Sequence, residues 1–152
     1  MSELTERERL ARLANTCAGI NLRRATRAIT NHYDHIFLEA VGLRSTQIPP
    51  LVVLYLAGPR TIQQMAERLD LDRTTLSRNL KLLEEAGLLA IHPGKDQRTR
   101  QVSLTEQGKN VLLKALPVWE EAQRQVVSGL GEDRFSALLA ELSDVAELSK
   151  EA

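Results

Sequence analysis

The stretch from Thr61 to Thr105 constrains the fold of this chain most, because it has the pattern of two helices followed by a two-stranded hairpin. Thr61 and Gln64 have the spacing of a capping box at the start of the first helix. Asp72 is a good N-cap for the second helix, and Gly87 is placed to end that helix in the left-handed conformation. The link between the two helices is short, so the pattern predicts a helix-turn-helix unit.

The second helix of this unit has two different faces. At about 100° per residue, leucines gather on one face, and hydroxyls and cations gather on the other. Short donors and acceptors suit base edges, and longer cations suit guanine or phosphate, so the polar face is typical of a helix that enters the major groove of DNA. An ordinary solvated helix face is the alternative interpretation. The candidate DNA-binding residues here are Arg73, Thr74, Thr75, Ser77, Arg78 and Lys81.

The hairpin that follows has a charged tip. Apolar residues alternate at period two in residues 88–92 and again in residues 101–105, which predicts two strands. The polar tip between them carries the candidate DNA-binding cations Lys95, Arg98 and Arg100. A basic hairpin after a recognition helix is a wing, and an arginine at its tip suits the minor groove. We expect Asp96 to pair with one of the arginines and to fix the tip. A flexible charged tip is the alternative.

These runs resemble one known family. The segments Asp72-Arg73-Thr74-Thr75-Leu76-Ser77-Arg78 and Leu83-Glu84-Glu85-Ala86-Gly87-Leu88 are similar to the recognition helix of MarR-family transcription regulators. Their wing is similar to Asp96-x-Arg98-x-Arg100 followed by Val102-Ser103-Leu104-Thr105 and Gly108. The resemblance implies a homodimeric winged helix that binds double-stranded DNA at pseudo-palindromic operators. It further implies a repressor that a small molecule or an oxidant releases.

Composition and charge agree with this interpretation. The chain has 152 residues, of which 43% are hydrophobic, and this suffices for a single domain over residues 1–152. Its formal net charge is zero, but the charge is polarised: residues 73–100 carry six cations and three acids, whereas residues 116–152 carry three cations and eight acids. The single cysteine excludes an intrachain disulfide framework. Without a signal peptide pattern or a long apolar run, we expect a cytoplasmic protein with no membrane contact.

Amphipathic helices are predicted on both sides of the winged unit. From about Leu4 to Val41 the apolar spacing predicts one long helix that Gly42 ends. Residues 51–56 predict a buried helix, although Pro49-Pro50 make its start awkward. After the wing we expect a helix over residues 106–130, kinked by Pro117, with Trp119 among its inward residues, and a last helix over residues 133–150.

The apolar stripes of the flanking helices exceed what the central unit can cover, which predicts dimerisation through them. The expected architecture is therefore mainly α with a small β-hairpin wing. Residues 58–105 form the winged helix-turn-helix DNA-binding unit, and residues 1–42 and 106–152 form the helical dimerisation region.

An effector cleft is implied at the junction of the first helix, the 51–55 helix and the kinked helix. MarR-family proteins often bind phenolic or other aromatic anions there. The side chains that could line the cleft or orient a carboxylate are Arg23, Arg24, Tyr33, His35, Tyr55 and Trp119. A packed core with an ordinary ion pair is the alternative.

Other chemistry has weaker support. Cys17 invites a redox interpretation, but it fits the apolar stripe, which favours a buried structural cysteine. His32 and His35 lie three apart without a supporting cluster, so we expect no metal and no cofactor. No phosphate loop and no nucleophile with a placed base is present, which argues against an enzyme. A winged-helix protein-interaction module without specific DNA binding is the alternative function.

Overall fold

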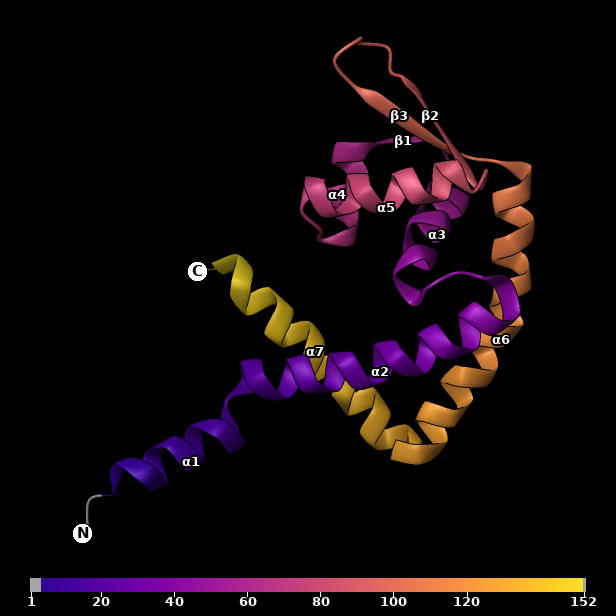
Figure 1. The fold of residues 1–152 in the computed structure, drawn as a ribbon. Coiled ribbons are helices and arrows are strands. Elements are labelled where there is room, and N and C mark those ends of the chain that lie inside the picture. The colour runs from indigo at the N-terminus through magenta and orange to yellow at the C-terminus, as the bar shows by residue number, and fades with distance from the viewer. Residues whose placement is uncertain (1–3, 152) are drawn as a thin grey trace.

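The computed structural model describes the backbone of residues 4–151 and the side chains of residues 4–148. The fold is mainly helical with a small antiparallel sheet, as predicted (Figure 1). Its helices and strands, in chain order, are α1 (Glu6–Thr16), α2 (Ala18–Val41), the 3-10 turn η1 (Ser45–Gln47), α3 (Ile48–Ala57), β1 (Arg60–Thr61), α4 (Ile62–Leu69), α5 (Arg73–Glu85), β2 (Leu89–Pro93), β3 (Arg100–Leu104), α6 (Glu106–Leu130) and α7 (Glu132–Glu151).

The predicted caps of the helix-turn-helix are confirmed. The Thr61 hydroxyl accepts from the Gln64 amide at 3.2 Å, and the Gln64 side chain accepts from the Thr61 amide at 3.0 Å. Asp72 caps α5 by accepting from the Thr75 amide at 2.8 Å. Asp70 takes the left-handed conformation, with φ of 51°, and turns the chain between α4 and α5. Local hydrogen bonds therefore fix the first turn of each of the two helices.

The end of α5 is a Schellman motif. The Leu88 amide donates to the Leu83 carbonyl at 2.9 Å, and the Gly87 amide donates to the Glu84 carbonyl at 2.9 Å. Gly87 has a φ of 73°, which is a conformation that costs glycine little and other residues more. The motif turns the chain sharply from α5 into the wing.

We call the unit formed by α3, α4, α5 and the three strands the reading head, and its core lies under α5. Leu76, Leu80 and Leu83 are fully buried, and they share one hydrophobic cluster with Met65 of α4 and Val102 of β3. The recognition helix therefore has one face anchored in the core and one face left outside. This burial explains why the leucine stripe, rather than helix propensity, sets the orientation of α5.

The sheet differs from the prediction in two respects. Its strand order is β1-β3-β2, so β3 pairs with β1 as well as with its hairpin partner, and Val102 lies opposite both Arg60 and Ile91. β1 was not predicted, because two residues are too short to show a period. The hairpin strands are 89–93 and 100–104, one residue off the predicted bounds at each end.

The prediction of one long N-terminal helix is wrong, because the helix is interrupted at Cys17, between α1 and α2. Cys17 has extended backbone angles there, with φ of −65° and ψ of 116°. The side chains of Asn15 and Thr16 bond back to carbonyls of α1, and the Asn21 side chain donates to the carbonyls of Asn15 and Cys17. These local side-chain bonds compete with the helical ladder, which explains the break. The expected end at Gly42 is confirmed by its left-handed φ of 71°.

Both prolines of α3 and the proline of α6 are accommodated. α3 begins at Ile48, so Pro49 and Pro50 lie in its first turn, where no amide donor is needed. α6 continues through Pro117 and curves along its length (Figure 1). Trp119 was expected to point inward, but it is 42% exposed at the rim of a hollow beside α3.

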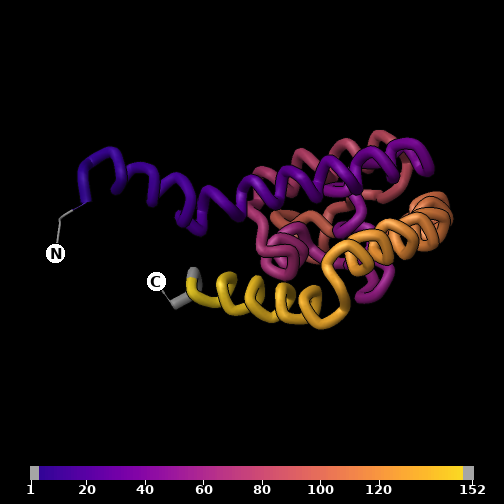
Figure 2. The backbone as a smooth tube through the Cα atoms, turned by 90° about the horizontal axis from the view of Figure 1, so that it is seen from below, coloured from indigo at the N-terminus to yellow at the C-terminus, as the bar shows by residue number. Residues whose placement is uncertain are grey.

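The helices far from the reading head leave apolar side chains exposed. α1 projects away from the rest of the chain (Figures 1 and 2). Its Leu10 is 66% exposed. α2, α6 and α7 border an open groove that is lined by Ile29, Leu138 and other apolar side chains. No helix within residues 4–151 has the length and hydropathy that crossing a membrane requires.

Candidate nucleic-acid interface

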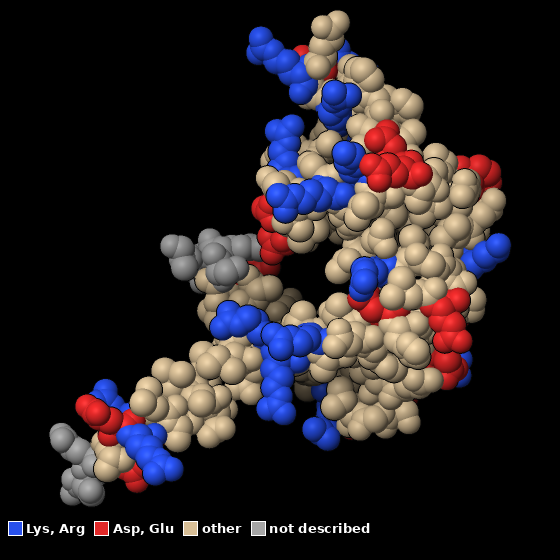
Figure 3. Space-filling model, viewed as in Figure 1, with Lys and Arg blue, Asp and Glu red and all other residues tan. Residues whose placement is uncertain are grey.

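The outward face of α5 presents the predicted cations and hydroxyls. Arg73, Thr74, Arg78 and Lys81 are exposed, and Ser77 is half-buried. These five residues line one shallow depression on the surface of the helix. Lysines and arginines gather over this edge of the head and over the wing in Figure 3. The arrangement offers several hydrogen-bond donors and at least three positive charges to one ligand. This combination suits a nucleic acid, in which charged phosphates lie close to the polar edges of the bases.

Thr75, the sixth predicted contact on α5, is already engaged. Its hydroxyl donates to the Asp72 carboxylate, and its amide donates to the same group. The Thr75 hydroxyl, followed by its amide, lowers the pKa of Asp72. Asp72 therefore stays ionised at the positive end of the helix dipole, which stabilises α5. Thr75 belongs to this cap, and its hydroxyl has no further proton to donate to a base.

The wing is held to the recognition helix by a residue that the sequence did not single out. The Glu84 carboxylate accepts from the Ile91 amide of β2 at 3.1 Å. A glutamate near a helix end has many ordinary roles, so no sequence signal distinguished this one. The bond fixes β2 relative to α5, and so it fixes where the wing tip can reach.

The wing tip is ordered by backbone bonds. The Gly94 amide donates to the Thr99 carbonyl at 2.8 Å, and the Thr99 amide donates to the Asp96 carbonyl at 2.9 Å. Asp96 does structure the tip, but the prediction that it pairs with an arginine side chain was wrong. Its carboxylate accepts from the backbone amide of Arg98 at 3.1 Å and makes no ion pair with an arginine among the described residues. An Asx-type turn uses the backbone amide two residues on, so Asp96 structures the tip without engaging a guanidinium group.

The three wing cations are exposed. Lys95 and Arg98 lie in the tip, and Arg100 begins β3. We call the outward predicted residues of α5 and the wing the reading surface: Arg73, Thr74, Ser77, Arg78, Lys81, Lys95, Arg98 and Arg100. In the view of Figure 3, lysines and arginines gather over both elements on one face of the molecule.

A second missed residue is Asn79, on the flank of α5. Its side-chain amide donates to the carbonyl of Thr46 in η1 at 2.7 Å. The two residues lie far apart in the sequence, so no local pattern predicted their contact. The bond attaches the recognition helix to the segment that leads from α2 into α3.

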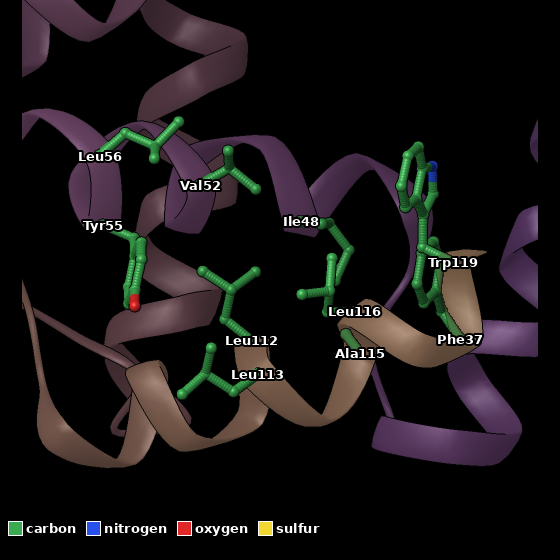
Figure 4. Close-up of a pocket in the computed structure, with 10 residues that line it drawn as sticks. All are labelled: Phe37, Ile48, Val52, Tyr55, Leu56, Leu112, Leu113, Ala115, Leu116 and Trp119. Carbon is green, nitrogen blue, oxygen red and sulfur yellow. The ribbon is translucent and has the colours of Figure 1, made fainter.

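A cleft lies at the junction where an effector site was expected, but its lining differs from the prediction. A cleft of about 410 Å³ lies between α3 and α6, and Tyr55 and Trp119 line it with apolar neighbours (Figure 4). Tyr33 lines an adjoining hollow, and its hydroxyl donates to Gln123 of α6 at 2.7 Å. The other three predicted residues, Arg23, Arg24 and His35, are exposed and line neither hollow. The Tyr55 hydroxyl and the Trp119 indole nitrogen are the polar side-chain groups of the cleft (Figure 4).

Two further expectations concern residues outside this cleft. Cys17 was expected to be buried, but it is only half-buried because it occupies the break between α1 and α2. Within the described part of the chain, no group of three His, Cys, Asp or Glu side chains is placed to hold a metal ion.

Comparison with known proteins gives the same architecture. A family profile described as a helix-turn-helix domain matches residues 52–92. An uncharacterized HTH-type transcriptional regulator of Bacillus anthracis is 29% identical over 129 residues, which are 80% of this chain and 86% of that protein. The transcriptional regulator MosR of M. tuberculosis, solved in complex with DNA, is 34% identical with a TM-score of 0.76, over 88% of this chain and 98% of that one.

A MarR family transcriptional regulator of Streptomyces coelicolor, also solved in complex with DNA, shares the fold. Its TM-score is 0.77 at 23% identity, over 95% of this chain and 92% of that one. These relatives are transcriptional regulators, not enzymes. Helix, wing and flanking helices all agree with them, and this chain belongs to the MarR family of winged helix-turn-helix transcription regulators.

Proposed function

We propose that this protein is a homodimeric repressor that binds a pseudo-palindromic operator and is released by a small apolar molecule. The observation that carries the proposal is the reading surface itself. Its helix is anchored by three fully buried leucines, and its outward cations and hydroxyls continue directly into a basic wing. Residues 58–105 are the DNA-binding unit of this proposal.

Each subunit inserts α5 into a major groove. Arg78 and Lys81 on its exposed face contact base edges or phosphates, and Ser77 and Thr74 supply shorter contacts. The wing follows the backbone, and Arg98 enters the flanking minor groove, where the potential is most negative. MosR and the S. coelicolor regulator were both solved with DNA, which supports this arrangement.

The dimer forms through residues 1–42 and 106–152. Support comes from the apolar side chains that a single chain leaves open to water: Leu139 is 52% exposed and Leu142 is 40% exposed on α7, beside a groove shared with α2. Exposed apolar patches of this kind mark association surfaces. A two-fold dimer places the two α5 helices about 34–36 Å apart, the pitch of B-form DNA.

The effector is a neutral, mainly apolar molecule rather than an aromatic anion. The cleft between α3 and α6 has no cationic lining residue, so a buried carboxylate would find no charge partner there. α3 is part of the reading head, whereas α6 belongs to the dimerisation region. A ligand between them therefore acts by favouring a head spacing that no longer matches the operator.

The test is selection from a library of the source genome's fragments at physiological salt. Enrichment of one palindromic element by the wild type, and its loss in the variant Arg78→Ala with Arg98→Ala, supports the proposal. Absence of any enriched element overturns it and favours the protein-interaction module. Sedimentation of the DNA-free protein tests the dimer, and a monomer at working concentrations would contradict it.

A further inference from the structure

The turn η1 lies between α2 and the recognition helix and is hydrogen-bonded to both. On one side, a single oxygen of Asp34 in α2 accepts from the Ser45 amide and from the Ser45 hydroxyl, each at 2.7 Å. On the other side, the Thr46 carbonyl accepts from the Asn79 side chain at 2.7 Å. Because Ser45 and Thr46 are adjacent, these bonds form a continuous relay from the dimerisation helix to α5.

The bonds at Asp34 are sheltered and charge-assisted. The Asp34 side chain is only 15% exposed, and an ionised acceptor makes stronger hydrogen bonds than a neutral one. Arg44 also approaches Asp34, at 3.1 Å, but its own side chain is 63% exposed, so this ion pair contributes less. The two Ser45 bonds are therefore stronger polar contacts between η1 and α2 than the ion pair is.

The turn itself is short and closed. The Gln47 side chain accepts from the Arg44 amide at 2.8 Å, and the Gln47 amide donates to the Arg44 carbonyl at 2.9 Å. Two hydrogen bonds that close the turn from both directions make it stiff. We therefore expect a displacement of Asp34 to be passed on to Thr46.

Asn79 is suited to receive that displacement. It lies on the flank of α5, between the buried leucine face and the exposed face that carries Arg78, and it is half-buried. One N–H of its side-chain amide is directed at Thr46. The residue thus ties the helix to η1 without belonging to the reading surface.

We infer that Asp34 and Asn79 are positioning residues: through Ser45 and Thr46 they set the angle of the recognition helix relative to α2. In the dimer this angle sets the separation of the two α5 helices. The inference rests on the proposed function, and it adds the residues that determine which half-site spacing is accepted. One base pair changes that spacing by about 3.4 Å, which a fixed angle cannot accommodate.

The first experiment measures affinity for the selected operator and for versions with one base pair inserted or removed. In Asn79→Ala the affinity for the natural spacing should fall about three- to tenfold, while the discrimination against altered spacings shrinks by a similar factor. Asp34→Ala should do the same, and the double variant should lose no more than either single one, because the residues act in series. Asn110→Ala, at an exposed asparagine of α6, is the matched control and should change neither quantity.

Two results would overturn the inference. An equal loss of affinity on every spacing would mean that Asn79 contacts DNA directly. Additive losses in the double variant would mean that the two residues act independently. Asp34→Asn, which keeps the shape of the side chain, replaces Asp34→Ala if that variant does not fold.

A second experiment uses the full chain without DNA, so that failure of the relay and failure of the proposed function are distinguishable. Asn79 does not touch Ser45, yet the relay predicts that Asn79→Ala makes hydrogen exchange at the Ser45 amide about fivefold faster. Asn110→Ala should leave the rate unchanged. An unchanged rate in Asn79→Ala overturns the relay even if the operator is bound. If hydrogen exchange at the Ser45 amide is faster in Asn79→Ala but the wild type selects no operator, the relay is supported and the proposed function is overturned.

Discussion

The carbonyl oxygen of Leu88 lies 1.9 Å from the position that a Cβ atom on Gly108 would occupy. The first turn of α6 therefore packs directly against the chain that leaves the recognition helix. Thr105 completes the junction: its hydroxyl donates to the Gly87 carbonyl at 2.7 Å and accepts from the Gly108 amide at 3.0 Å. This contact explains physically why threonine and glycine are spaced as they are after the wing.

Replacing Gly108 with alanine should therefore destabilise the protein. A backbone carbonyl cannot move aside as a flexible side chain can, so we expect Gly108→Ala to lower the free energy of unfolding by about 1–3 kcal/mol. Urea denaturation at fixed protein concentration measures this. Gly129→Ala is the control, because nothing lies within 4 Å of its Cβ position in the same helix. It should leave stability unchanged or raise it by up to about 1 kcal/mol, and a Gly108→Ala protein of equal stability would contradict the packing argument.

Arg78 should determine both affinity and sequence preference. If its guanidinium reads a base, Arg78→Ala weakens operator binding by about 1–3 kcal/mol and relaxes the preference at one base pair. Arg78→Lys keeps the charge but loses the paired donors, so it should recover part of the affinity and little of the preference. Gel-shift titration against operators substituted at single positions separates the two effects. Unchanged affinity and unchanged preference in Arg78→Ala would remove Arg78 from the interface.

Unlike Arg78, Arg98 should contribute to operator affinity through its charge, by attraction to the phosphates and to the negative potential of the minor groove. Arg98→Ala is expected to weaken binding to all sequences and to reduce the slope of log affinity against log salt by about 1. Titrations across a range of salt concentrations measure the slope. Lys114→Ala removes a cation from α6, outside the reading surface, and should leave the slope as it is. If Arg98→Ala keeps both affinity and slope, the wing is not a contact element.

The parts of this fold that the sequence predicted are those fixed by neighbours in the chain. The Thr61 and Asp72 caps and the Gly87 stop use bonds that span a few residues, so their residue types and spacing identify them. The cationic face of α5 follows from the same local logic, since the leucines fix which side is buried. The basic tip of the wing was also predicted from neighbouring residues, because a polar cationic run separates two segments that alternate at period two.

The parts that the sequence did not predict depend on distant partners or on competing weak bonds. Asn79 donates a hydrogen bond to Thr46, which lies 33 residues earlier in the chain. β1 is a strand because its two residues pair with β3. The break at Cys17 arises where side-chain hydrogen bonds outweigh a continuous apolar stripe. Arg23 and Arg24 were expected as possible lining residues because they lie on the helix that borders the cleft. The α2 residue that lines it is Phe37, near the other end of that helix and about 20 Å away along its axis.

The apolar cleft leads to a prediction about ligand charge. Methyl benzoate should release operator DNA at a concentration at least about tenfold lower than benzoate does, because burying an unpaired carboxylate is unfavourable. Leu116→Arg places a guanidinium in the lining and should reduce or reverse this preference. Asn110→Arg adds the same side chain to α6 outside the cleft and serves as the control. Fluorescence anisotropy of labelled operator measures release, and a preference of the wild type for benzoate would contradict the prediction.

Asp34 should make stability depend on pH in a narrow acidic range. The Ser45 hydroxyl and amide, together with Arg44, hold the pKa of the Asp34 carboxyl below its usual value. A lowered folded pKa contributes stability that is fully present above the unfolded value of about 3.9 and is lost as the pH falls towards the folded value. The difference in unfolding free energy between the wild type and Asp34→Asn should therefore be constant from neutral pH down to about 4 and shrink below it. Urea denaturation at several pH values measures that difference, in which other acids with lowered pKa values, such as Asp72, cancel. A difference that stays constant below this range would mean that the charge of Asp34 does not hold η1 to α2.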